Sequence, residues 1–170
     1  WQIEIENRIK AVNDIVSRAE SAANKEPSDH AVAEPLYRQL ILTHDKHQKV
    51  MLDPNQGYHY YLFAKVLFYA AEPDSTWLGC NKPDKAREGV AMAEIGLRFF
   101  PNAAAIRYWR ACCYMILQEK DKARKEFEGI EKDAQTPENW KKSARSRIDS
   151  IDRSGIKNPG PNVKPQAGGD

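Results

Sequence analysis

The strongest constraint on the fold is the placement of proline along a chain whose apolar residues recur at helical spacing. Proline lacks a backbone N–H and clashes with the preceding turn, so it ends one helix or begins the next. Between the prolines, apolar side chains recur every three or four residues, which predicts amphipathic helices and no strand. The prolines that separate these stretches are Pro27, Pro54, Pro73, Pro101 and Pro137.

Seven helices are predicted from this pattern. The second is expected to begin near Ser28 or, preferably, to restart at Pro35, because proline fits best in a first helical turn. Thr136 is expected to cap the last helix, with Pro137 at its first position. The predicted helices cover residues 3–23, 28 or 35 to 52, 56–71, 84–100, 103–117, 121–134 and 137–152. Such short connections predict antiparallel helix pairs that stack on one another.

Composition excludes several classes of protein. Hydrophobic residues make up 41% of the chain and charged residues 29%, which is typical of a folded globular protein. The net charge of +2 does not indicate a nucleic-acid partner. Cys80, Cys112 and Cys113 lack the spacing of metal ligands, although a disulfide from Cys80 to either of the others stays open. No phosphate-binding loop or nucleophile motif is present, so neither an enzyme nor a cofactor is predicted.

The start of the chain bears on its location. The apolar stretches are too short to cross a bilayer. The first residue is Trp1 rather than Met, as it would be after removal of a signal peptide or membrane anchor. This start favours an exported, periplasmic or envelope-associated chain over a cytoplasmic one. Membrane association is expected only indirectly or through a removed N-terminal anchor.

One stretch of sequence carries a repeat motif. Ala111 and Tyr114 take the small and aromatic positions of one helix, and Ala123, Phe127 and Ile130 follow at matching spacing in the next. These residues resemble the tetratricopeptide repeat (TPR) family, in which two helices alternate and small residues stand where the helices cross. Over residues 56–134 the resemblance implies a helical repeat that holds other proteins.

An earlier repeat unit matches more loosely. Ala64 and Ala86 take its small positions, but an insertion of about ten residues around Trp77 separates its helices. Within the better unit, Arg107 stands where the family often has Trp. The insertion is also the candidate lid if the chain instead binds a small ligand.

The resemblance implies a short right-handed array of about three antiparallel helix pairs, with a capping helix around Trp140. The array would form one domain over residues 1–153, followed by an extended Pro/Gly-rich tail over residues 154–170. Prolines pre-set an extended backbone, so the tail is expected to lie along a neighbouring subunit. The expected tail contacts are Lys157, Pro159, Pro161 and Lys164.

In TPR proteins the first helix of each pair lines a concave groove. Carrying the motif over residue by residue places on this groove Tyr58, Tyr61, Lys65, Phe68, Tyr108, Cys112 and Met115. The three tyrosines are expected to be exposed there, whereas packing in the core is at least as well supported for Phe68 and Met115. The predicted function is a scaffold or adaptor that binds a peptide or subunit of another protein. The alternative is a non-catalytic accessory subunit of a membrane- or envelope-associated enzyme complex.

Overall fold

The computed structural model describes residues 2–46 and 56–154. This part of the chain is all-α, as predicted, and its helices lie close to the expected ranges. They are α1 (Gln2–Ala23), α2 (His30–Lys46), α3 (Gln56–Ala70), α4 (Pro83–Phe99), α5 (Ala104–Ile116), α6 (Lys120–Lys132) and α7 (Glu138–Arg153).

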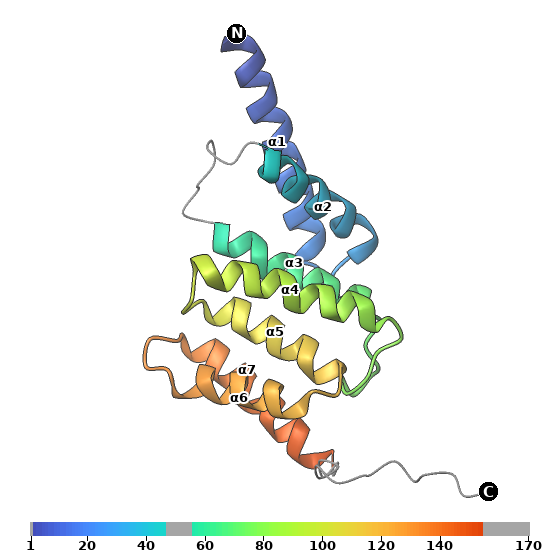
Figure 1. The fold of residues 1–170 in the computed structure, drawn as a ribbon, viewed down its shortest axis with the longest axis vertical. Coiled ribbons are helices and arrows are strands. Elements are labelled where there is room, and N and C mark those ends of the chain that lie inside the picture. Colours follow the sequence, from blue (N-terminus) through green and yellow to red (C-terminus); the bar gives the residue numbers. More distant parts are fainter. Residues whose placement is uncertain (1, 47–55, 155–170) are drawn as a thin grey trace, which may run out of the picture.

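Each helix packs against the next one along the chain, so the helices form adjacent pairs in sequential order. Figure 1 shows them following one another along the long axis, with the N-terminal half of α1 extending beyond the body at one end. Helix α3 also packs against α1 and α5, and α5 packs against α7. Within the described residues, the backbones of α2, α4 and α6 do not approach one another. We call α1, α3, α5 and α7 the continuous layer.

Helix α3 is the centre of the molecule because its residues are apolar on every side. A helix that is hydrophobic all round must be buried. Leu62 and Phe63 belong to the core shared with α1 and α2, whereas Ala64 and Phe68 belong to the core shared with α4, α5, α6 and α7. The two cores therefore meet at this one helix.

Small residues stand where the helices come closest. The side chains predicted at helix crossings, Ala64, Ala86, Ala111 and Ala123, are all 0% exposed, which confirms their expected burial. A Cβ atom added to Gly89 would lie 2.8 Å from the Cys113 Sγ. Helix α4 can therefore approach α5 this closely because position 89 has no side chain.

Helix α2 begins earlier than preferred from the sequence. It starts at His30 and runs through Pro35, so the predicted restart at Pro35 is wrong. The Asp29 carbonyl accepts the N–H groups of Val32 and Ala33 at 3.2 and 2.9 Å. These bonds form a first turn ahead of Pro35, and buried Ala33 anchors that turn in the core. The missing proline N–H then affects only the beginning of the helix.

The start of α7 also differs from its prediction. Pro137 occupies the cap position without a side-chain cap, and the helix begins at Glu138. Thr136 does not cap it, because its hydroxyl donates to the Asp133 carboxylate at 3.2 Å. The same carboxylate accepts the backbone N–H of Gln135 at 2.9 Å. A charged acceptor close in sequence thus holds the threonine in the preceding turn.

Candidate functional site

Aromatic side chains of the continuous layer and of the loop after α3 form one connected group of ring contacts. They come from α3, from the loop that joins α3 to α4, from α5 and from α7. We call this set the aromatic face: Tyr61, Phe68, Tyr69, Trp77, Tyr108, Trp109 and Trp140. Tyr61, Tyr69, Trp77 and Trp140 are half-buried, so the face is partly open to solvent.

One half of the aromatic face is centred on Trp77. Its ring centroid lies 4.5 Å from that of Phe68, 6.2 Å from that of Tyr69 and 6.4 Å from that of Trp109. Rings at such separations attract each other by about 0.5–1.5 kcal/mol per pair beyond the area that they bury. The loop tryptophan is therefore held against α3 and α5 by several ring contacts at once.

The other half joins α3 to α7 across α5. Trp140 lies 5.2 Å from Tyr108 and 6.4 Å from Tyr61, measured between ring centroids. Because Trp140 comes from α7 and Tyr61 from α3, the two ends of the face are linked although these helices are far apart in sequence. The half-buried Tyr61 and Trp140 form the open edge of this half.

The insertion that carries Trp77 is organised by Asp74. One oxygen of its carboxylate accepts the Thr76 hydroxyl at 2.7 Å, the Thr76 N–H at 2.9 Å and the Leu78 N–H at 3.1 Å. The Thr76 hydroxyl is the largest influence on this carboxyl group, and the bonds together lower the pKa of Asp74. This local hydrogen bonding turns the loop back onto the body of the protein.

The backbone of Trp77 has a strained conformation. Its φ is 58°, in the left-handed region that side chains with a Cβ avoid. This conformation costs about 1–2 kcal/mol for a residue other than glycine. The Arg147 guanidinium of α7 lies 3.6 Å from the centroid of the Trp77 ring, where a cation is attracted to the π-electrons. The contacts of the ring thus offset the strain.

A buried lysine lies beside the aromatic rings. Lys65 is only 5% exposed, and its ammonium lies 5.7 Å from the centroid of the Trp109 ring. It donates to the Glu26 carboxylate at 2.5 Å, and the Tyr69 hydroxyl donates to the other oxygen at 3.0 Å. Burial, followed by the charge of Glu26, raises the pKa of Tyr69. A buried ammonium requires such a counter-charge, and here a loop between α1 and α2 supplies it.

The structure revises several predicted groove residues. Tyr108 is 6% exposed, so its expected exposure is wrong. Helix α7 covers it, because Trp140 packs on its ring and Arg147 donates to its hydroxyl at 3.2 Å. Tyr61 is half-buried, as a groove residue would be. Four more candidates are buried in this chain: Lys65, Phe68, Cys112 and Met115.

Five of the predicted contacts cannot be placed. The side chain of Tyr58 and the tail residues Lys157, Pro159, Pro161 and Lys164 lie outside the described part of the chain. Ser154, the last described residue and the first of the predicted tail, accepts a hydrogen bond from the buried Lys120 at 3.0 Å.

Sequence reasoning missed Glu26, Tyr69, Trp109 and Arg147. One signal was present, because Tyr61, Lys65 and Tyr69 recur at every fourth position and so share one side of α3. Glu26 and Arg147 carried no local signal, since each reaches the face from another part of the chain.

The three cysteines are free thiols, so neither of the possible disulfides is formed. Cys112 and Cys113 are fully buried. Burial raises the pKa of Cys112 to about 12 and that of Cys113 well above its ordinary value. A thiol that stays protonated is a poor nucleophile, so these two residues act as small core side chains.

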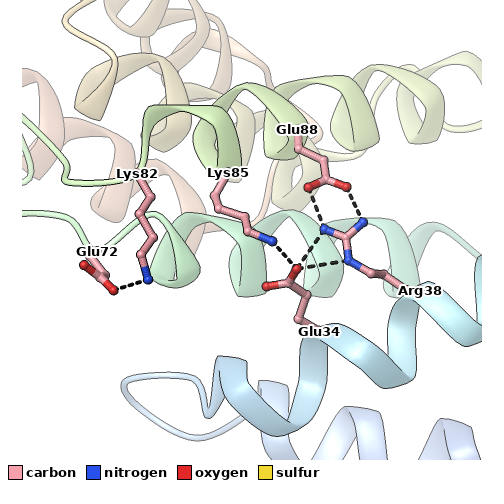
Figure 2. A network of polar contacts seen from close by, with 6 residues as sticks. All are labelled: Glu34, Arg38, Glu72, Lys82, Lys85 and Glu88. Carbon is pink, nitrogen blue, oxygen red and sulfur yellow. Dashed lines mark hydrogen bonds and ion pairs between the residues drawn. The ribbon is translucent and has the colours of Figure 1, made fainter.

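A second group of polar residues fastens α2 to α4 (Figure 2). Arg38 of α2 contacts both oxygens of Glu88 at 2.5 and 2.6 Å and donates to Glu34 at 2.7 Å. Lys85 of α4 donates to the same Glu34. Although burial opposes the effect, the hydrogen bonds from Lys85 and Arg38 lower the pKa of Glu34. The network connects two helices whose backbones stay apart, which is a structural role.

Two features are absent from the described residues. No helix among them is long and apolar enough to span a bilayer. Within the same ranges, no group of three or more His, Cys, Asp and Glu side chains is arranged to hold a metal ion. Comparison of the chain with known protein families, with curated proteins and with solved structures finds no match.

Proposed function

We propose that the chain is a short TPR-like array of helix pairs. The packing supports this, because the first helices of successive pairs contact one another in the continuous layer while the second helices stay apart. Small residues at 0% exposure stand at the positions that the family reserves for them. In this arrangement α7 is the capping helix: Trp140 packs on Tyr108 of the array, and Lys142, Arg145 and Arg153 are exposed to solvent.

The proposed function is that of a scaffold that binds a segment of another protein on the aromatic face. The observation that carries this proposal is the half-buried state of four aromatic side chains that belong to one cluster: Tyr61, Tyr69, Trp77 and Trp140. Tyrosine and tryptophan with one edge in solvent provide large contact area and a polar tip, and they are enriched among residues that dominate binding energy.

The charges beside the rings favour a polar or charged partner segment over a purely apolar one. Arg147 is half-buried over Trp77, and Lys65 lies beneath the exposed Glu26. Cationic groups at the border of an aromatic surface add orientation and specificity to contacts that are mainly apolar.

Capture experiments with matched variants test the proposal. Wild-type protein, Tyr61→Ala, Trp140→Ala and Phe99→Ala are used as bait in lysate of the source cells, and captured proteins are quantified by mass spectrometry. Phe99 is the control because it is a 57% exposed aromatic side chain of α4 outside the aromatic face. We expect the two variants of the face to lose about tenfold or more of a specific partner, as for aromatic hot spots of about 1–2 kcal/mol.

Folding must be measured beside binding. Circular dichroism at increasing temperature separates loss of the surface from loss of the fold. If all three variants capture the same proteins as wild type, the aromatic face is not the binding surface. If Tyr61→Ala and Trp140→Ala unfold before any binding is lost, the two side chains serve stability alone.

A further inference from the structure

We propose that Glu26 and one ring of the aromatic face, Trp77, fill two positions that an acidic and an aromatic side chain of the partner take in the complex, the remaining rings of the face being the surface that receives them. The partner segment would thus carry a carboxylate close to an aromatic ring, and it would bind by displacing these two residues. This inference rests on the proposed function and specifies the class of partner.

The acidic position is defined by Lys65. Its ammonium is almost fully buried, yet the carboxylate that neutralises it belongs to a side chain that is 68% exposed. Glu26 also accepts the Tyr69 hydroxyl at 3.0 Å. Two donors on α3 therefore converge on one carboxylate that reaches them from solvent. A carboxylate of another molecule would find the same two donors if Glu26 left.

The aromatic position is defined by the surroundings of Trp77. Phe68 lies on one helix, Trp109 on a second and Arg147 on a third, and all contact the Trp77 ring. Trp77 fills this position with a left-handed backbone conformation, at φ 58°. Strained residues of this kind gather at switches and ligand clamps. A partner ring would gain the same contacts without the strain in this loop.

A third observation points to an absent acceptor atom. Trp109 is 6% exposed, and its indole N–H has no hydrogen-bond partner within the described residues. An unsatisfied buried donor is costly, so an oxygen atom that a partner placed beside this N–H would stabilise the complex.

The two positions are adjacent and both can be vacated. Tyr69 contacts Glu26 through its hydroxyl and Trp77 through its ring, at a centroid distance of 6.2 Å. Both stand-in residues lie in loops between helices, so their departure leaves every helix intact. With Glu26 displaced, Lys65 and Arg147 are two cations that favour an acidic segment and disfavour a basic one.

Synthetic peptides test this inference on the full chain. The probes are labelled Gly/Ser peptides that contain one Glu and one Trp separated by one to four residues, with matched peptides in which Gln or Lys replaces Glu or Ala replaces Trp. Binding is measured by fluorescence anisotropy for wild type, Glu26→Gln and Trp77→Gly. Glu94→Gln and Ser75→Gly are the controls, since both side chains are exposed outside the face.

We expect the Glu/Trp peptide to bind about tenfold more tightly to Glu26→Gln and Trp77→Gly than to wild type, because self-occupancy is reduced in each. The Gln, Lys and Ala peptides should bind more weakly than the Glu/Trp peptide. Nitrogen–proton correlation spectra should show the indole signals of Trp77 and Trp109 shifting when peptide is added. Lys65→Met combined with Glu26→Gln replaces the ion pair by two uncharged side chains and leaves Arg147 in place, so it should clearly reduce the preference for Glu over Gln relative to Glu26→Gln alone.

The inference is overturned if neither Glu26→Gln nor Trp77→Gly binds the Glu/Trp peptide more tightly than wild type while both remain folded. It is also overturned if the double variant prefers Glu over Gln as strongly as Glu26→Gln alone does, since Lys65 would then not bind the carboxylate of the peptide. Should Tyr61→Ala still weaken capture of a native partner in that case, the proposed function stands and only the class of partner is wrong.

Discussion

We predict that Trp77→Gly is more stable than Trp77→Ala, which is the reverse of the usual order for these two substitutions. Removing a fully buried tryptophan costs about 3–5 kcal/mol, and Trp77 is half-buried. We therefore expect Trp77→Ala to cost about 2 kcal/mol of unfolding free energy, with up to about 1 kcal/mol more for the lost Arg147 contact. Trp77→Gly loses the same contacts but relieves the strain at φ 58°, so it should cost about 1 kcal/mol less.

Urea unfolding followed by circular dichroism provides the measurement. With a slope of about 2 kcal/mol per molar urea, the midpoint should fall by about 1 M for Trp77→Ala and by about half as much for Trp77→Gly. Ser75 is the matched control, because it is exposed in the same loop and its φ is not positive. There the order should reverse, since glycine at an ordinary backbone position costs about 0.4–1 kcal/mol of chain entropy relative to alanine.

The comparison of the two positions decides the outcome. If Trp77→Gly is less stable than Trp77→Ala, the left-handed backbone at position 77 carries no strain, and the view of Trp77 as a strained stand-in is refuted. If both variants are as stable as wild type, the ring contacts with Phe68 and Trp109 contribute nothing to folding.

Two further predictions concern the repeat packing and the loop. Ala111→Leu and Ala123→Leu should each lower the free energy of unfolding by about 1–3 kcal/mol in the same urea assay, because the larger side chain forces apart helices that meet at 0% exposed positions. Ala91→Leu is the control, at an exposed position of α4, and should leave the free energy of unfolding almost unchanged. The pKa of Asp74 is lowered from 3.8 by its hydrogen bonds, so its stabilising effect is fully present above about pH 4 and is lost as pH falls through the lowered value. Asp74→Asn should therefore show less acid-dependent loosening of the loop, measured by tryptophan fluorescence; identical acid profiles would contradict a role for this carboxylate.

Local information in the sequence determined the helices and the small residues buried between them. Helical spacing and proline depend on neighbours within a turn or two, so each helix was predictable without knowledge of the others. The alanine positions of the repeat motif indicated which small side chains would be buried between helices. Tyr61 was expected to be exposed because of its place in the repeat motif, and it is half-buried in the structure.

Tertiary structure alone decided how the aromatic face is closed. Tyr108 was predicted to be exposed, but Trp140 and Arg147 of α7 cover it. The position of Trp77 depends on the turn around Asp74 and on a guanidinium that is far away in sequence. Likewise, Glu26 meets Lys65 only because α1 and α2 fold back onto α3. Helical periodicity records which side of a helix is apolar, whereas the residue that finally covers that side is chosen by the packing of distant segments and by the need to neutralise a buried charge.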